Sequence, residues 1–191
     1  MSRGRVEVLL DDQPWRTLPA EVVLRAGLDV GVALDRERAR RVRRELKRHE
    51  AMARAARALR TRDLSAAELD ARLGRAKVAP AARAETIERL TDAGAVDDER
   101  FARSRAQALA DRGAGDFLVR HDLEARGIAA EAIEAAIASL EPETERAATT
   151  CRRRGTGPKT ARYLARKGFA EDVIESICVG AVAEHDPPVV R

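Results

Sequence analysis

A helix-ending motif that occurs twice, 41 residues apart, points to a repeat architecture. Residues 123–128 are Leu-Glu-Ala-Arg-Gly-Ile, and residues 164–169 are Leu-Ala-Arg-Lys-Gly-Phe. The same offset continues at the apolar positions that follow, where Ile133 aligns with Ile174 and Ile137 aligns with Cys178. Glycine just past a helix accepts a left-handed backbone without steric cost, and the apolar residue after it folds back on the preceding turn. The motif therefore predicts tight turns at Gly127 and Gly168, each between two helices.

A weaker copy of the motif precedes these two. Leu73 and Val78 occupy its first and last positions, but Lys77 stands where the glycine belongs. The next helix, around Leu90, comes late because residues 80–83 lengthen the connection. Three copies at a spacing of about 40 to 50 residues are typical of helical units that stack on one another.

The repeats predict an all-α protein made of three tandem three-helix repeats in an elongated array, preceded by a small β-hairpin and helix module. The expected organisation is a hairpin module with a basic helix at residues 1–48, repeats at 49–95, 96–141 and 142–183, and a flexible tail at 184–191. A β-branched residue resists positive φ, so valine at either turn glycine should cost about 1 kcal/mol or more.

Two local patterns predict a hairpin near the N-terminus and the start of a helix within the first repeat. The β-prone run at residues 6–10 and the return segment at 15–19 predict an antiparallel hairpin, for which Trp15 is the expected docking residue. Further on, Ser65 and Glu68 have the spacing of a capping box, which predicts a helix beginning there.

Charge is segregated along the chain. Charged residues make up 36% and aromatic residues 3%, so the helices must pack through small aliphatic contacts. Residues 36–62 carry twelve Arg or Lys against three Glu, and residues 152–167 carry seven against no acid, although the whole chain has a net charge of only +4. The first segment is either a ridge that follows phosphates or a solvated helix surface. The sequence leaves both open, and also leaves open whether residues 36–60 form one helix or two, broken near His49.

Other classes of site are not indicated. Cys151 and Cys178 lack metal-binding spacing, and Cys178 falls on an apolar repeat position, which favours a buried thiol. The Gly-Thr-Gly segment at 155–157 lacks the rest of a phosphate-binding loop. No nucleophile–base couple, paired carboxylates, metal cluster or membrane-spanning run stands out. We therefore expect a cytoplasmic, monomeric protein that is not an enzyme and needs no cofactor or metal.

The motifs together resemble those of the bacterial RecX family. The resemblance rests on residues 62–69 (Arg-Asp-Leu-Ser-x-x-Glu-Leu), on 97–102 (Asp-Asp-Glu-Arg-Phe-Ala) and on the two glycine turns, and it covers about residues 50–180. The hairpin resembles an extension found in part of the family. The chain departs from the family pattern at Lys77 and at 114–115, where an aromatic–glycine pair is common.

The resemblance implies a curved helical-repeat array that lies along the groove of the RecA filament on single-stranded DNA. It also implies negative control of RecA, with strand exchange, ATP hydrolysis and co-protease activity inhibited. Two other classes stay open: a stand-alone nucleic-acid-binding repeat protein that contacts DNA directly, and a scaffold for a different protein.

If the middle helices of the repeats line one face, their basic residues are the candidate contacts with the partner. These residues are Arg72, Arg75, Arg120, Arg126, Arg162, Arg166 and Lys167. The alternative contact is the basic helix, represented by Arg38, Arg41 and Arg44. For any single one of these residues the sequence favours simple solvation of the surface, and the case for contact rests on the set as a whole, in which Arg126 and Lys167 are related by the 41-residue offset.

Overall fold

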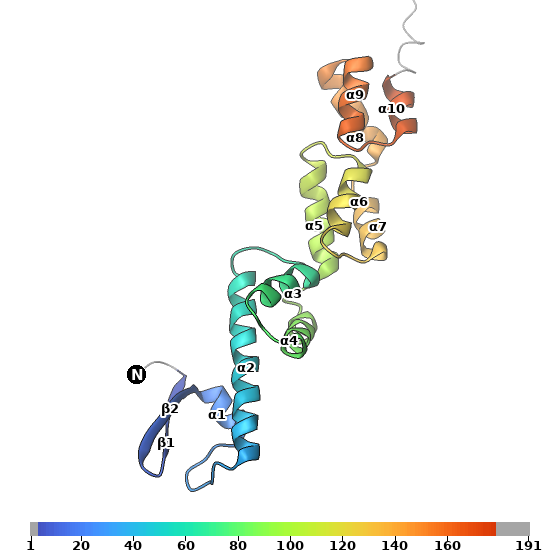
Figure 1. Cartoon of the computed structure of the whole chain (residues 1–191). Coiled ribbons are helices and arrows are strands. Elements are labelled where there is room, and N and C mark those ends of the chain that lie inside the picture. The colour runs from blue at the N-terminus through green and yellow to red at the C-terminus, as the bar shows by residue number, and fades with distance from the viewer. Residues whose placement is uncertain (1–3, 179–191) are drawn as a thin grey trace, which may run out of the picture. The chain divides into compact units, whose positions relative to one another are not determined.

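The computed structural model describes residues 4–178 of the chain, and within them it is helical apart from one antiparallel hairpin (Figure 1). The elements are β1 (Arg5–Leu10), β2 (Gln13–Pro19), α1 (Ala20–Ala26), α2 (Arg36–Leu59), α3 (Ala66–Arg75), α4 (Pro80–Asp92), α5 (Asp98–Ala110), α6 (Asp116–Glu124), α7 (Ala130–Ala138), α8 (Glu143–Arg154), α9 (Pro158–Arg166) and α10 (Glu171–Cys178). The prediction of a helical protein with strand only near the N-terminus is confirmed. The predicted tail at 184–191 lies outside the described residues.

The chain forms two compact units. The first contains residues up to 64 together with 69–95, and the second contains residues 65–68 together with everything from 96 onward. The first turn of α3 therefore belongs to the second unit, while the rest of α3 belongs to the first.

In the first unit, α1 packs beside the N-terminal half of α2, and the hairpin packs on α1 (Figure 1). The strands pair from Arg5 opposite Pro19 to Leu10 opposite Gln13, with an irregularity between Val8 and Leu9. The core that joins them to the helices consists of Leu18, Val22, Ala26 and Val42. Trp15 was the wrong docking residue: it is 38% exposed, because the strand irregularity falls beside it and Leu18, the apolar residue nearer to α1, points into the core instead.

Helix α2 is continuous over 24 residues, which answers the question left open by the periodicity. The side chain of Asp35 caps its first turn by accepting a hydrogen bond from the backbone N–H of Arg38 at 2.7 Å. The helix runs through His49 without a break and packs against α4, where Arg48 bridges Glu45 and Glu85 at 2.6 and 2.8 Å. The expected border between residues 48 and 49 consequently falls inside a helix.

The second unit contains two three-helix groups, α5–α7 and α8–α10 (Figure 1). The first surrounds an aliphatic core, and the second surrounds a core of Ala147, Cys151, Leu164, Phe169 and Cys178. Positions related by the 41-residue offset are buried in both groups: Ala106 with Ala147, Leu123 with Leu164, and Ile128 with Phe169. The predicted burial of Cys178 is confirmed, since it is 2% exposed. Repetition in the sequence is thus repetition in the packing.

Candidate interaction surface

The three copies of the motif form the same turn. The backbone N–H of the motif's last residue donates to the carbonyl of its first: Val78 to Leu73 at 3.1 Å, Ile128 to Leu123 at 3.2 Å and Phe169 to Leu164 at 3.2 Å. This six-to-one bond is the Schellman arrangement, and it requires a left-handed residue just before the last position. Gly127 and Gly168 supply it with φ of 71° and 80°, and Lys77 adopts it as well with φ of 59°.

The glycines have a second role that explains why the first repeat tolerates lysine. A Cβ built on Gly127 would lie 2.5 Å from the Cβ of Ala67, and one on Gly168 would lie 2.7 Å from the backbone nitrogen of Leu118. These positions are close-approach points between successive repeats in the second unit. Lys77 is exposed. The side chain that departs from the family pattern is therefore found at the turn whose surroundings leave room for it.

The start of a middle helix is held by the repeat that follows it. In the first repeat, Ser65 Oγ donates to the carbonyl of Arg126 at 2.7 Å. At the equivalent position of the second repeat, the backbone N–H of Gly115 donates to the carbonyl of Lys167 at 2.8 Å. The next backbone N–H in each case meets a carboxylate. Asp98 accepts from Ala66 at 2.8 Å, and Glu143 accepts from Asp116 at 2.6 Å. An acidic residue at the start of one repeat thus satisfies free N–H groups at a helix start in the repeat before it.

The candidate contact residue Arg126 is occupied by this junction. Its guanidinium donates to Glu68 at 2.5 Å and to Asp122 at 2.7 Å, and its side chain is only 23% exposed. Arg105 donates two further hydrogen bonds to Asp122, both at 2.8 Å. The hydrogen bond from Arg105, and then the one from Arg126, hold the pKa of Asp122 well below its usual range despite partial desolvation. The pKa values of Arg105 and Arg126 are raised, chiefly by their hydrogen bonds to Asp122.

Arg120, the other candidate in the second repeat, is also ion-paired. It forms a two-pronged contact with Glu134 on α7, with both nitrogen–oxygen distances at 3.0 Å. The candidate cations of this repeat therefore face carboxylates of the same chain.

In the third repeat the candidates are placed differently. Arg162 and Arg166 on α9 are exposed, and within the described part of the chain neither has an acidic partner. Lys167 is half-buried, with Nζ 3.2 Å from the carbonyl of Arg112. With their neighbours on α8 and α9 they form what we call the third-repeat basic face, which comprises Arg152, Arg153, Arg154, Lys159, Arg162, Arg166 and Lys167.

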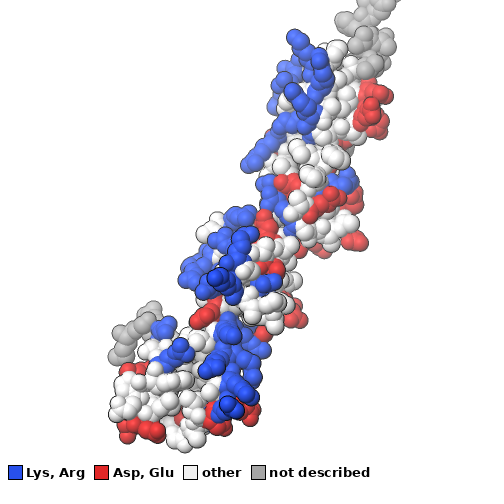
Figure 2. Space-filling model, in the orientation of Figure 1, with Lys and Arg blue, Asp and Glu red and all other residues white. Residues whose placement is uncertain are grey.

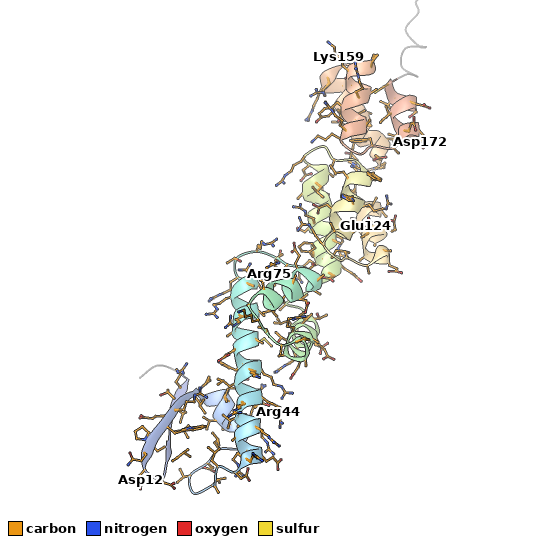
Figure 3. All side chains as sticks on the ribbon, in the orientation of Figure 1. Asp12, Arg44, Arg75, Glu124, Lys159 and Asp172 are labelled. Carbon is orange, nitrogen blue, oxygen red and sulfur yellow. The ribbon has the colours of Figure 1, made fainter. Side chains whose placement is uncertain are left out.

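This face contains one aromatic side chain. The guanidinium of Arg154 lies 4.0 Å from the ring centroid of Tyr163, and the ammonium of Lys167 lies 5.8 Å from it. Figure 2 shows the cations gathered over α8 and α9 and acidic residues over α10, and Figure 3 shows Lys159 on α9 and Asp172 on α10. The charges of the third repeat are consequently separated, with a basic side on α8 and α9 and an acidic side on α10.

A second cationic surface lies on α2 in the first unit, where a column of basic side chains is visible (Figure 2). Arg38 is tied to the carbonyl of Ala33 and Arg41 is 3.4 Å from Glu37, so two of the three predicted ridge residues have local partners. Arg44 is exposed and pairs with no acid in the described chain (Figure 3). The exposed cations of α2 that share this property include Arg36, Arg40, Arg43, Arg44 and Lys47.

Arg72 and Arg75 complete the candidates. Both are exposed on α3 in the first unit, where Arg75 marks the helix end (Figure 3). Three features of these surfaces were missed in the sequence: the Arg105–Asp122 pair, the carboxylates Asp98 and Glu143 at the junctions, and Tyr163 among the cations. Tyr163 could have been found, since it is the one aromatic residue within the acid-free run 152–167.

Residues 4–178 contain no group of three or more His, Cys, Asp or Glu side chains that could hold a metal ion. None of their helices combines the length and the apolarity needed to cross a bilayer.

Comparison with known proteins gives a consistent picture. A family model described as the second three-helix domain of RecX matches residues 97–137. The regulatory protein RecX of Xanthomonas axonopodis pv. citri (strain 306) is 37% identical over 125 residues, which are 60% of this chain and 77% of the relative. The regulatory protein RecX of Deinococcus radiodurans is 32% identical over 155 residues, 76% of this chain and 74% of the relative.

Two solved structures share the fold. A crystal structure of regulatory protein RecX superposes with a TM-score of 0.80 at 20% identity and covers 92% of this chain and 93% of its own. That of RecX from Lactobacillus salivarius gives 0.63 at 19% identity, with 72% and 97% covered. With its repeated turns, its three-helix groups and these relatives, the chain belongs to the RecX family.

Proposed function

We propose that this chain is a negative regulator of the RecA recombinase that binds the RecA filament on single-stranded DNA. In this role it inhibits strand exchange, ATP hydrolysis and co-protease activity. The observation that carries the proposal is membership of a family whose relatives are named regulatory protein RecX. In this proposal the chain acts in the cytoplasm as a monomer and works by binding, with no reaction or cofactor of its own.

The charge distribution supports a partner that contains a polyanion. The third-repeat basic face has no ion pair with a carboxylate of the described chain, and the same holds for the exposed α2 cations Arg36, Arg40, Arg43, Arg44 and Lys47. Lys and Arg that contact phosphates release condensed counterions, which supplies affinity without base specificity. Arg105, Arg120 and Arg126 of the second repeat are excluded from this role, because their hydrogen bonds go to Asp122, Glu134 and Glu68.

The proposal is tested by co-sedimentation. RecA from the same source is assembled on single-stranded DNA with ATP, and the chain is centrifuged with the filament, with RecA alone, with DNA alone and by itself. We expect it to pellet with the filament, and to slow RecA-driven strand exchange when titrated up to a one-to-one ratio with RecA. Absence of inhibition over that titration would refute the regulatory function.

The alternative is a stand-alone nucleic-acid-binding protein, and the Tyr163 ring between two cations is the observation that favours it. Aromatic side chains beside basic residues are platforms on which single-stranded bases stack. In that case the chain would bind single-stranded DNA without RecA and with a steep salt dependence. If neither DNA nor RecA retains the chain, a scaffolding role for another protein takes their place.

A further inference from the structure

The third repeat contains two buried thiols in contact. Cys151 on α8 and Cys178 on α10 are free cysteines, 6% and 2% exposed, and their Sγ atoms lie 3.4 Å apart. A disulfide bond is about 2.05 Å long, so the two sulfurs need to approach by about 1.4 Å to bond. They come from helices that pack directly on each other, although 27 residues separate them in the sequence.

The packing of a repeat does not require sulfur at these positions. The 41-residue offset aligns Cys151 with Ala110 and Cys178 with Ile137, and both of these pack against the core of the second repeat. The same helix pair therefore assembles with alanine and isoleucine. A pair of contacting thiols in the third repeat calls for an explanation in their chemistry.

We propose that Cys151 and Cys178 are an oxidative modification site at which a peroxide joins them in an intramolecular disulfide that ties α10 to α8. One cysteine, as thiolate, attacks hydrogen peroxide; the O–O bond breaks, hydroxide leaves, and a sulfenic acid forms. The sulfur of the other cysteine then attacks the sulfenic sulfur, the S–O bond breaks, and water leaves with the proton of the second thiol. Overall the two thiols lose two electrons and two protons, and the peroxide is reduced to two molecules of water.

The position of the pair connects it to the basic surface. All seven cations of the third-repeat basic face lie between Cys151 and Cys178 in the sequence. The disulfide closes a covalent loop around the end of α8, all of α9 and α10. Helix α10 has only eight residues and packs on both α8 and α9. A covalent link from α10 to α8 therefore stabilises the packing of the two helices that carry the cations.

The reaction is slow in the closed repeat, because burial, followed by the contact with Cys178, raises the pKa of Cys151 to about 11. At neutral pH only a very small fraction of this thiol is ionised, and the thiolate is the reactive form. The site therefore responds to sustained oxidation or to opening of α10, and its rate of oxidation rises by about tenfold per pH unit below the pKa.

The test treats the reduced full-length chain with hydrogen peroxide under native conditions. Intact mass, non-reducing peptide mapping and thiol titration follow the product. We expect a monomer that has lost two hydrogen atoms, has no titratable thiol and carries a Cys151–Cys178 cross-link. Its melting temperature should rise by several degrees and return to the starting value with dithiothreitol.

Each matched variant replaces a cysteine with the residue found at the aligned position of the second repeat, Ala110 or Ile137. Cys151→Ala and Cys178→Ile should keep the helical circular-dichroism spectrum, and on oxidation each should give a sulfenic or sulfinic acid and no rise in melting temperature. The proposal is overturned if the full-length chain keeps both thiols reduced after prolonged treatment. It is equally overturned if the products are disulfides between molecules or separate sulfinic acids.

Discussion

Arg126 is the residue whose role the structure changes most. It lies at the same repeat position as Lys167, yet it joins Glu68 and Asp122 across a repeat junction, where all three side chains are less than a quarter exposed. Removing one partner from such a site leaves the others poorly solvated charges. Reversing the charge of Arg126 would test the junction rather than binding.

Asp122→Asn gives a clean test of this network. The folded-state pKa of Asp122 lies below the unfolded value, so the unfolded chain binds the proton more readily and the network stabilises the fold at neutral pH. We expect the substitution to lower the free energy of unfolding by about 1–3 kcal/mol at pH 7. The difference from the parent chain should shrink as the pH falls below about 4, where the unfolded carboxyl titrates.

Urea denaturation at a series of pH values measures both effects. Glu134→Gln is the control, because its pair with Arg120 is more exposed, with 60% of the Glu134 side chain accessible. Exposed pairs contribute about 0–1 kcal/mol, so this variant should be nearly silent. Equal losses in the two variants would contradict the junction's role.

The turn glycines provide the second prediction at this scale. Gly127→Ala adds both a left-handed backbone penalty and a clash with Ala67, whereas Gly94→Ala adds only the penalty: φ at Gly94 is 67°, and no atom lies within 4 Å of its added Cβ. We expect about 1 kcal/mol for Gly94→Ala and about 2–4 kcal/mol for Gly127→Ala.

Thermal or urea unfolding of the two variants side by side isolates the close approach between repeats. If both lose the same stability, then Gly127 is required for its backbone conformation alone, and the repeats can move apart at little cost.

At the scale of elements, the basic helices α2 and α9 are the two candidate interaction surfaces. Both have exposed cations without acidic partners in the described residues, so both can be reversed without breaking an ion pair within residues 4–178. Lys159, Arg162 and Arg166 represent α9, and Arg40, Arg43 and Arg44 represent α2. These sets avoid Arg126, Arg38 and Arg41, which have partners of their own.

Reversal of the α9 set to Glu should weaken binding to the RecA filament by about tenfold or more, and should reduce the salt slope by about 0.7 for each phosphate that the variant no longer binds. The α2 set is the matched control, with the same number of reversed charges on a helix of the other unit. Filament co-sedimentation at several salt concentrations measures both, and circular dichroism checks that helicity is kept. Normal binding by the α9 variant together with weakened binding by the α2 variant would assign the interaction to α2.

At the scale of the whole molecule, the fold is a series of repeats that are not identical to one another. The turn of the first repeat carries Lys77 where Gly127 and Gly168 stand later, and the third repeat concentrates the acid-free run 152–167. The repeats of this chain therefore differ in charge.

For the whole chain, we expect filament binding to fall steeply as salt is raised, because the proposed interaction contacts several phosphates together. Inhibition of strand exchange should fall in parallel. The measurement is a strand-exchange titration repeated between low and physiological salt, with RecA activity without the chain as the reference at each concentration. Inhibition that is independent of salt would indicate a contact with RecA protein alone.

The sequence alone determined the helices, their turns and the repeat, because these depend on contacts a few residues apart. The helix cap at Asp35, the six-to-one turn bond and the left-handed glycine all depend on neighbouring residues. The turn bond and the glycine then recur in the sequence at the 41-residue offset. Tertiary structure decided which arginines are free, because their partners come from elsewhere in the chain: Glu68 is 58 residues from Arg126. It likewise decided that Leu18 rather than Trp15 docks the hairpin, since the strand irregularity sets which side chain faces the core.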